Sequence, residues 1–395
     1  MDYKKEALKI HESHQGKVEI HGKFPIKTKE DLSLAYTPGV GAVSEAIAED
    51  KAKAYTHTMK GNTIAIITDG SSVLGLGNIG ALAGLPVIEG KAIICKEFAQ
   101  IDAFPICLAS QNVRSTIATI KNIAPTFGGI ILEDIKAPEC FLIEQALQDL
   151  GIPVMHDDQH GTAVVVLAAV INALKVKKKQ ISELRIVVNG AGAAGIALTN
   201  LLLAYGANGT YITLCDSKGI IYFGREDFSE NPQKEEMSKK VNTARKKGSL
   251  ADALKGADLF IGVSVKNLLT KAMIRSMAEK PIIIAMANPD PEILPKDAKE
   301  AGAYIVATGR SDFPNQVNNA LAFPGIFRGA LDVRATKITE TMKIAAAEAI
   351  ASLVEKPSPE EIIPSLFDKN LVINVAQAVA KAWQETPSSE AVEEK

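Results

Sequence analysis

The feature that most constrains the fold is an apolar segment, residues 184–189, that runs directly into the turn Gly190-Ala-Gly-Ala-Ala-Gly195 and then into a helical pattern over residues 196–205. A strand, a G-x-G-x-x-G turn and a helix in this order are typical of a dinucleotide-binding βαβ unit. The glycines allow a tight turn, close approach of a pyrophosphate and close packing of the helix on the strand, while the helix amino terminus faces the phosphates. The residues expected to bind the dinucleotide are Gly190, Gly192, Ala193, Ala194 and Gly195.

The next expected strand, residues 210–216, ends in an acidic residue, Asp216. An acid at this position binds the ribose hydroxyls of NAD, whereas a nearby cation accommodates the 2′-phosphate of NADP. Lys218 follows two residues later, so the sequence leaves both NAD and NADP open as cofactor. Asn288 ends the expected strand over residues 281–288 and is a further candidate contact to the cofactor.

Two other apolar segments, residues 129–134 and 153–158, also end in acidic residues. Single acids at strand ends usually cap helices or are solvated. Two acidic pairs brought to one edge of a parallel sheet repel each other unless a cation neutralises them. Oxygen ligands suit Mg²⁺ or Mn²⁺, so we expect such a cation at this edge. The acidic residues concerned are Glu133, Asp134, Asp157 and Asp158.

Tyr36 and Lys91 are each open to two interpretations. Tyr36 precedes a Thr-Pro-Gly turn and a helical pattern over residues 42–54. In one interpretation its ring packs against the fold, and in the other its hydroxyl donates a proton beside an anion bound at the helix end. Lys91 stands at the head of an expected strand, residues 92–95. It either extends its ammonium group to the surface or is a desolvated lysine whose lowered pKa makes it a general base.

The asparagines near the expected strand ends have two possible uses. Asparagine at such positions caps turns or binds a carboxylate ligand. The candidates for binding a substrate carboxylate are Asn288, Asn318 and Asn319.

Length and composition bound the architecture. The chain has 395 residues, which suggests two domains, and its net charge of −2 argues against a nucleic-acid partner. Four scattered cysteines, a polar amino terminus and apolar runs too short to cross a bilayer favour a cytoplasmic protein without membrane contact.

We expect an α/β fold of two lobes, an N-terminal α/β substrate and metal domain and a Rossmann-type, doubly wound parallel-sheet NAD(P)-binding domain. The expected boundaries are 1–160, 161–385 and a disordered tail over 386–395, and the C-terminal helices are free to pack back on the first lobe.

The motifs together resemble those of the malic enzyme family, in its short bacterial and archaeal type, over residues 36 to 335. The matching segments are Tyr36-Thr-Pro-Gly-Val-Gly41, Thr68-Asp-Gly70, Leu74-Gly-Leu-Gly-Asn-Ile-Gly80, Gly84-Leu-Pro-Val87, Glu133-Asp134, His156-Asp-Asp-Gln-His-Gly-Thr162, Asn318-Asn319 and Phe323-Pro-Gly325.

This resemblance implies oxidative decarboxylation of (S)-malate to pyruvate and CO₂, with NAD or NADP and Mg²⁺ or Mn²⁺, by a homodimer or higher homo-oligomer. It implies that Tyr36 is the general acid and Lys91 the general base, and that Asp157 orients Lys91. The implied metal ligands are Glu133, Asp134 and Asp158, and the implied malate ligands are Asn288, Asn319 and Asn318.

The sequence departs from the family in one turn, where larger members carry an arginine that grips the substrate carboxylate and this chain has Ser71-Ser72. Two alternatives remain open: a malolactic-type enzyme that keeps its NAD bound and releases lactate, and a non-catalytic dinucleotide sensor. The acidic residues argue against a sensor, because sensing requires no metal.

Overall fold

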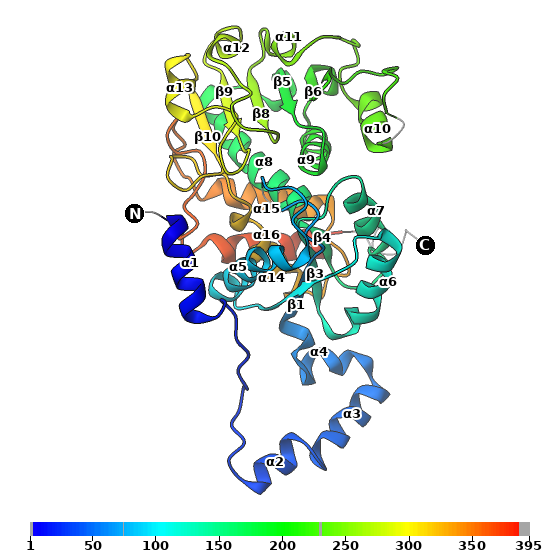
Figure 1. Cartoon of the computed structure of the whole chain (residues 1–395). Helices are drawn as coiled ribbons and strands as arrows, with labels where there is room; N and C mark the ends of the chain where they lie inside the picture. Colours follow the sequence, from blue (N-terminus) through cyan, green and yellow to red (C-terminus); the bar gives the residue numbers. More distant parts are fainter. Residues whose placement is uncertain (1–2, 74, 229–230, 387–395) are drawn as a thin grey trace.

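The computed structural model describes residues 3–73, 75–228 and 231–386, and it contains two separate β-sheets (Figure 1). The smaller sheet has the strand order β2-β1-β3-β4, and all of its strand pairs are parallel. Its strands are β1 (Thr63–Thr68), β2 (Asp102–Cys107), β3 (Gly129–Leu132) and β4 (Val154–His156).

The helices that accompany this sheet follow its strands in the chain. They are α5 (Ala81–Ala99), α6 (Val113–Ile123) and α7 (Glu139–Ala146). The strand expected over residues 92–95 is wrong, since these residues belong to α5. Apolar residues lie on the exposed side of α5 as well as on its buried face, as Ile93 and Cys95 show, so the short apolar run resembles that of a strand.

The larger sheet has the order β10-β9-β8-β5-β6-β7, with parallel pairing except for the short antiparallel edge strand β7. This is the expected doubly wound, dinucleotide-binding architecture. Its strands are β5 (Ile186–Asn189), β6 (Ile212–Asp216), β7 (Gly219–Ile220), β8 (Leu259–Gly262), β9 (Ile282–Ala285) and β10 (Ile305–Thr308). Its helices are α9 (Ala193–Ala204), α10 (Pro232–Lys240), α11 (Leu250–Leu254), α12 (Lys271–Arg275) and α13 (Pro295–Glu300).

Helix α8 (Asp157–Lys177) leads from the smaller sheet to the larger one (Figure 1). Its residues belong to one apolar core cluster that also includes β1, β3, β5 and β8 side chains. Among the described helices, α8 is long and apolar enough to cross a membrane, but 78% of its apolar window is buried inside the molecule. It is therefore the central core helix of this fold.

Three C-terminal helices return to the first lobe (Figure 1). They are α14 (Phe323–Asp332), α15 (Glu340–Ser352) and α16 (Leu371–Gln384). Arg328 of α14 donates a hydrogen bond to Asn62, directly before β1, at 2.7 Å. The domain boundary at residue 160 stays a prediction, because α8 runs through it. Of the expected disordered tail, all but Thr386 lies outside the described residues.

The N-terminal region contains α1 (Tyr3–His14), α2 (Lys29–Ala35), α3 (Gly39–Glu49) and α4 (Ala54–His57), and none of these helices has a buried residue. Figure 1 shows α2 and α3 projecting away from both sheets. The short 3-10 helices are η1 (Lys51–Lys53), η2 (Met59–Asn62), η3 (Ala124–Thr126), η4 (Ile181–Glu183), η5 (Gly209–Tyr211) and η6 (Asn319–Leu321).

Candidate active site

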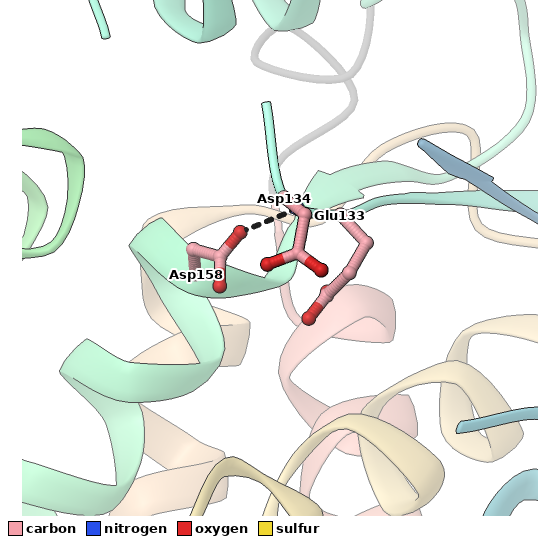
Figure 2. Close-up of side chains that lie close together, drawn as sticks. All are labelled: Glu133, Asp134 and Asp158. Atoms are coloured by element: carbon pink, nitrogen blue, oxygen red, sulfur yellow. Dashed lines mark hydrogen bonds between the residues drawn. The ribbon is translucent and has the colours of Figure 1, made fainter. Parts of the chain in front are cut away.

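The register of β3 and β4 brings the two acidic pairs together. Leu132, the last residue of β3, is the partner of His156, the last residue of β4. The residues that follow both strands therefore leave the sheet side by side at its carboxyl edge. The backbone N–H of Asp134 donates to Asp158 Oδ2 at 2.8 Å, which ties the two strand ends together (Figure 2).

The carboxylates of Glu133, Asp134 and Asp158 form a cluster in which one oxygen of each lies within 4.8 Å of the others (Figure 2). Glu133 and Asp134 are buried, and within the described part of the chain Glu133 Oε2 has no hydrogen-bond partner. Burial, and then the charge of Asp158, raise the pKa of Glu133 well above its usual value. A buried carboxylate oxygen without a donor, among other carboxylates, fits a hard divalent cation as its missing partner.

Lys91 lies beside this cluster in the middle of α5 and is buried. Its ammonium group contacts the carboxylate of Asp157 and lies 3.0 Å from Glu133 Oε1. The Phe323 ring covers the same ammonium group, with its centroid 4.6 Å from Nζ. The ammonium group is therefore enclosed by two carboxylates and an aromatic face, and it does not extend to the surface.

The expected lowering of the Lys91 pKa is wrong for this arrangement. Burial by itself lowers the pKa of Lys91, but the charges of Asp157, Glu133 and Asp158 outweigh burial and raise it above its usual value. The prediction considered desolvation alone, and the nearby carboxylates reverse its effect.

The three asparagines differ in how their side chains are used. Asn319 Nδ2 donates to Asp157 Oδ2 at 2.7 Å, so this asparagine belongs to the lysine network. Asn318 caps η6 by accepting from the Ala320 N–H at 2.9 Å. Asn288 is exposed just beyond β9, where a Cβ at Gly75 would lie 2.1 Å from its carbonyl oxygen. The loop that contains Gly75, in the first lobe, thus packs against the second lobe at Asn288.

The structure does not bring the side chain of Tyr36 to this cluster. Tyr36 is the C-cap residue of α2, and 66% of its surface is exposed. Helices α2 and α3 lie at the end of the molecule away from α8 (Figure 1).

Ser71 has a structural use in the turn where the family arginine is missing. Its hydroxyl donates to Asp69 Oδ1 at 2.6 Å and accepts from the Lys136 N–H at 3.0 Å. The N–H of Ser72 donates to the carbonyl oxygen of Asp134 at 2.9 Å. The two serines therefore fix the backbone at Asp134 and at Lys136, at the carboxyl end of the acidic pair that follows β3.

Glu144 of α7 is a buried acid that the sequence analysis missed. Its carboxylate accepts from the His156 N–H at 2.7 Å, from Gln159 Nε2 at 3.0 Å and lies 3.1 Å from His160 Nε2. These contacts hold the end of β4 and the first turn of α8, which carry Asp157 and Asp158. No local pattern singles out this acid, because it lies within a helix and meets His156 and His160 only in the folded chain.

The turn that follows β5 has the geometry expected of a phosphate-binding loop. Gly190 has a φ of 116°, and a Cβ on Gly195 would lie 1.7 Å from the Gly190 carbonyl oxygen, so both positions require glycine. Gly192 is the N-cap of α9, whose first residues are Ala193 and Ala194. The helix amino terminus thus opens toward the carboxyl edge of the larger sheet, where anions bind.

Asp216 at the end of β6 is already paired with cations. Arg225 donates to its two oxygens at 3.0 and 2.5 Å, and Lys234 Nζ lies 3.0 Å from Oδ2. Burial alone would raise the pKa of Asp216, but the hydrogen bonds from Arg225 and Lys234 outweigh burial and lower this pKa to about 2. Lys218 instead pairs with Asp227 at 2.9 Å. Sequence reasoning missed Arg225 and Lys234 because the chain must fold back before they reach Asp216.

Comparisons with known proteins agree with this architecture. Residues 15–115 match the family model described as "Malic enzyme, N-terminal domain", and residues 159–384 match "Malic enzyme, NAD binding domain". The chain is 57% identical to the "Bifunctional malic/malolactic enzyme" of Bacillus subtilis (strain 168), and the match covers 98% of this chain and 94% of that protein.

Two further relatives differ in their named cofactor. The "NADP-dependent malic enzyme" of Escherichia coli (strain K12) is 50% identical over 97% of this chain and 52% of its own length. The crystal structure of an NAD-dependent malic enzyme from Thermotoga maritima superposes with a TM-score of 0.92 at 50% identity, covering 95% of this chain and 98% of that one. The chain therefore belongs to the malic enzyme family, as an NAD(P)-dependent member that is built from two α/β lobes.

Proposed function

We propose that this protein catalyses the oxidative decarboxylation of (S)-malate to pyruvate and CO₂, with reduction of NAD or NADP. The observation that carries the proposal is the buried lysine, Lys91, placed between Asp157 and the carboxylate cluster. A proton acceptor beside a cation site at the edge of a parallel sheet suits the oxidation of a hydroxy acid. The relatives named above act on the same substrate class.

We infer that Glu133, Asp134 and Asp158 hold Mg²⁺ or Mn²⁺. When bound there, the cation supplies Lewis-acid stabilisation of negative charge on a substrate oxygen. The charges of Asp157, Glu133 and Asp158 raise the pKa of Lys91 and favour its protonated form, so the lysine accepts a proton only when that charge is offset. Lys91 then takes the proton of the C2 hydroxyl, and the hydride from C2 goes to the dinucleotide.

The remaining residues have positioning and binding roles in this proposal. Asp157 holds the Lys91 ammonium group, and Asn319 in turn holds the Asp157 carboxylate. Asn288, exposed at the edge of the second lobe, is free to bind a malate carboxylate or the cofactor. Asn318 retains its cap and offers its amide N–H₂ group as a second carboxylate donor.

A product assay tests the proposal. Purified protein is incubated with (S)-malate and Mn²⁺, in NAD and in NADP separately, and NAD(P)H, pyruvate and lactate are quantified. The proposal predicts pyruvate and reduced cofactor in equal amounts. Absence of pyruvate, lactate and reduced cofactor under all of these conditions would overturn it and favour a dinucleotide sensor.

The name of the Bacillus relative gives reason to test a malolactic activity as well. In that reaction, pyruvate is reduced again before it leaves, so lactate accumulates without net NADH. The same assay separates the two, because lactate formation at constant absorbance identifies the malolactic route. We also propose a cytoplasmic location and a homodimeric assembly.

A further inference from the structure

Glu292 is a buried acid that the candidate active site does not use. It lies in the loop between β9 and α13, and its exposed fraction is 0%. Burial raises the pKa of Glu292, and hydrogen bonds from backbone N–H groups counteract this effect. In the described part of the chain its carboxylate is held by N–H and hydroxyl donors, not by a cation. Its function is therefore to be found in the backbone that it binds.

The carboxylate of Glu292 joins the loops that leave two neighbouring strands. Its Oε1 accepts from the Ser264 N–H at 2.9 Å and from the Ser264 hydroxyl at 3.2 Å. Its Oε2 accepts from the Ala287 N–H at 3.1 Å. The pairing of β8 with β9 ends at Gly262 and Ala285, so both N–H groups lie beyond the strand ladder. Glu292 supplies the acceptors that the sheet no longer provides there.

The position of Glu292 is fixed by its surroundings. A Cβ on Gly262 would lie 2.4 Å from Glu292 Cδ, so the carboxylate occupies the space that this glycine leaves open. The carbonyl oxygen of Glu292 accepts from the Leu269 N–H at 3.0 Å. Side chain and main chain of the same residue therefore hold both ends of the segment 264–269.

Ser264 extends this network to β5 and the glycine turn. The side chain of Asn189, the last residue of β5, donates to Ser264 Oγ at 2.7 Å. Gly190 follows, and a Cβ there would lie 2.4 Å from the carbonyl oxygen of Val263. The backbone before Ser264 thus packs against the first glycine of the turn. Three adjacent strands, β5, β8 and β9, are connected in this way at one edge of the sheet.

This edge is the one at which open α/β sheets bind dinucleotides, since it lies at the carboxyl ends of the parallel strands. The matched NAD-binding domain, residues 159–384, contains all three strands. Val265 and Asn288 directly follow Ser264 and Ala287, and both are exposed. Glu292 itself is covered, so it acts on a bound dinucleotide only through the loops that it holds.

We propose that Glu292 is a positioning residue for dinucleotide binding, which fixes the loops after β8 and β9 and the turn after β5 in the arrangement that receives the cofactor. Without its carboxylate, the N–H groups of Ser264 and Ala287 lose their acceptors and the two loops separate. The affinity for the dinucleotide then falls, whereas the acidic cluster of the first lobe keeps its place.

A fluorescence titration of the full-length protein with NADH tests this role. In Glu292→Gln the amide has a single acceptor oxygen, so one of the two backbone N–H groups faces an N–H₂ group whichever way the amide is turned. The dissociation constant for NADH is expected to rise at least about tenfold. KM for NAD(P) should rise with it, while Mn²⁺ binding measured by calorimetry stays at the wild-type value.

Asp258→Asn is the matched control. Asp258 is also buried and also accepts a backbone N–H, that of Arg185 at 3.1 Å, but it lies directly before β8, at the opposite edge of the sheet. This substitution is expected to destabilise the fold and to leave the NADH affinity unchanged. An affinity that is unchanged in Glu292→Gln, or that falls equally in Asp258→Asn, would overturn the proposal, because the acid would then have a stabilising role alone.

Ser264→Ala tests the same network with Glu292 in place, and it decides the matter if Glu292→Gln does not fold. Asn189 loses its acceptor in this variant, so the dissociation constant for NADH is expected to rise about threefold. An unchanged constant in the folded variant would overturn the proposal. The titration requires no malate, so a protein that binds NADH as described but does not oxidise malate refutes the proposed function alone.

Discussion

The ammonium group of Lys91 and the carboxylate of Asp157 form a buried ion pair that joins the middle of α5 to the first turn of α8. The two residues are 66 positions apart in the chain. Removing one partner of a buried pair leaves the other charge without compensation. The pair therefore links the folding of the first lobe to the placement of the proposed base.

Replacing Lys91 by alanine should abolish turnover while dinucleotide binding persists. The loss of a positioned base is expected to reduce kcat by about 10²–10⁴-fold. Steady-state kinetics and a fluorescence titration with NADH measure the two properties. Lys96→Ala is the control, because Lys96 lies on the same helix in an exposed pair with Asp102. Turnover in Lys91→Ala equal to that of Lys96→Ala would remove Lys91 as the base.

Replacing Gly161 by alanine should impair catalysis through Asp157. A Cβ at this position would lie 1.9 Å from Asp157 Oδ1, so the carboxylate must move away from its place beside Lys91. A displacement of about 1 Å at such a site costs about 10²-fold in rate. Gly90→Ala is the matched control, since a Cβ on this neighbour of Lys91 in α5 meets nothing within 4 Å. Equal rates in the two variants would contradict this role.

Arg225 and Lys218 should influence the choice between NAD and NADP. Arg225 neutralises Asp216, and Lys218 lies two residues further along the chain, so both cations are close to where a 2′-phosphate binds. We expect Arg225→Ala to lower kcat/KM for NADP relative to NAD by about tenfold, and Lys218→Ala to lower it less. Lys240→Ala, in an exposed pair with Glu236, is the control. Unchanged ratios in both variants would refute the prediction.

Asn172 should contribute to stability without affecting chemistry. Its buried amide donates to the carbonyl oxygens of Ala351 at 2.8 Å and Ile362 at 3.0 Å, which ties α8 to the C-terminal region. Replacement by alanine leaves buried acceptors unpaired and is expected to lower the free energy of unfolding by about 1–3 kcal/mol. Urea denaturation of Asn172→Ala, with partly exposed Asn200→Ala for comparison, measures the loss. An unchanged midpoint would show that these bonds contribute no net stability.

The sequence predicted those parts of the site that depend on local pattern. The acids after β3 and β4 and the glycines after β5 follow from strand ends, which short apolar runs mark clearly. The helix around Lys91 does not follow from its local pattern, because apolar residues such as Ile93 also occupy its exposed side and obscure the helical periodicity.

Long-range partners could not be predicted in the same way. The pairing of Arg225 with Asp216 and of Asn319 with Asp157 depends on how the chain folds back, and no local pattern encodes it. The raised pKa of Lys91 has the same origin, since its carboxylate neighbours come from the residue after β3 and from the first turn of α8. The position of Tyr36 away from the cluster likewise depends on how α2 and α3 project from the body.

The most direct test of the account is the metal dependence of turnover in the wild type and in Asp158→Asn. Removing one ligand of the cluster formed by Glu133, Asp134 and Asp158 should weaken Mn²⁺ binding by at least about tenfold, as measured by calorimetry. EDTA should abolish the initial rate of malate oxidation by the wild type, and Mn²⁺ should restore it there but not in Asp158→Asn at the same concentration. Turnover that EDTA leaves unchanged would contradict the central claim that these carboxylates hold a catalytic cation.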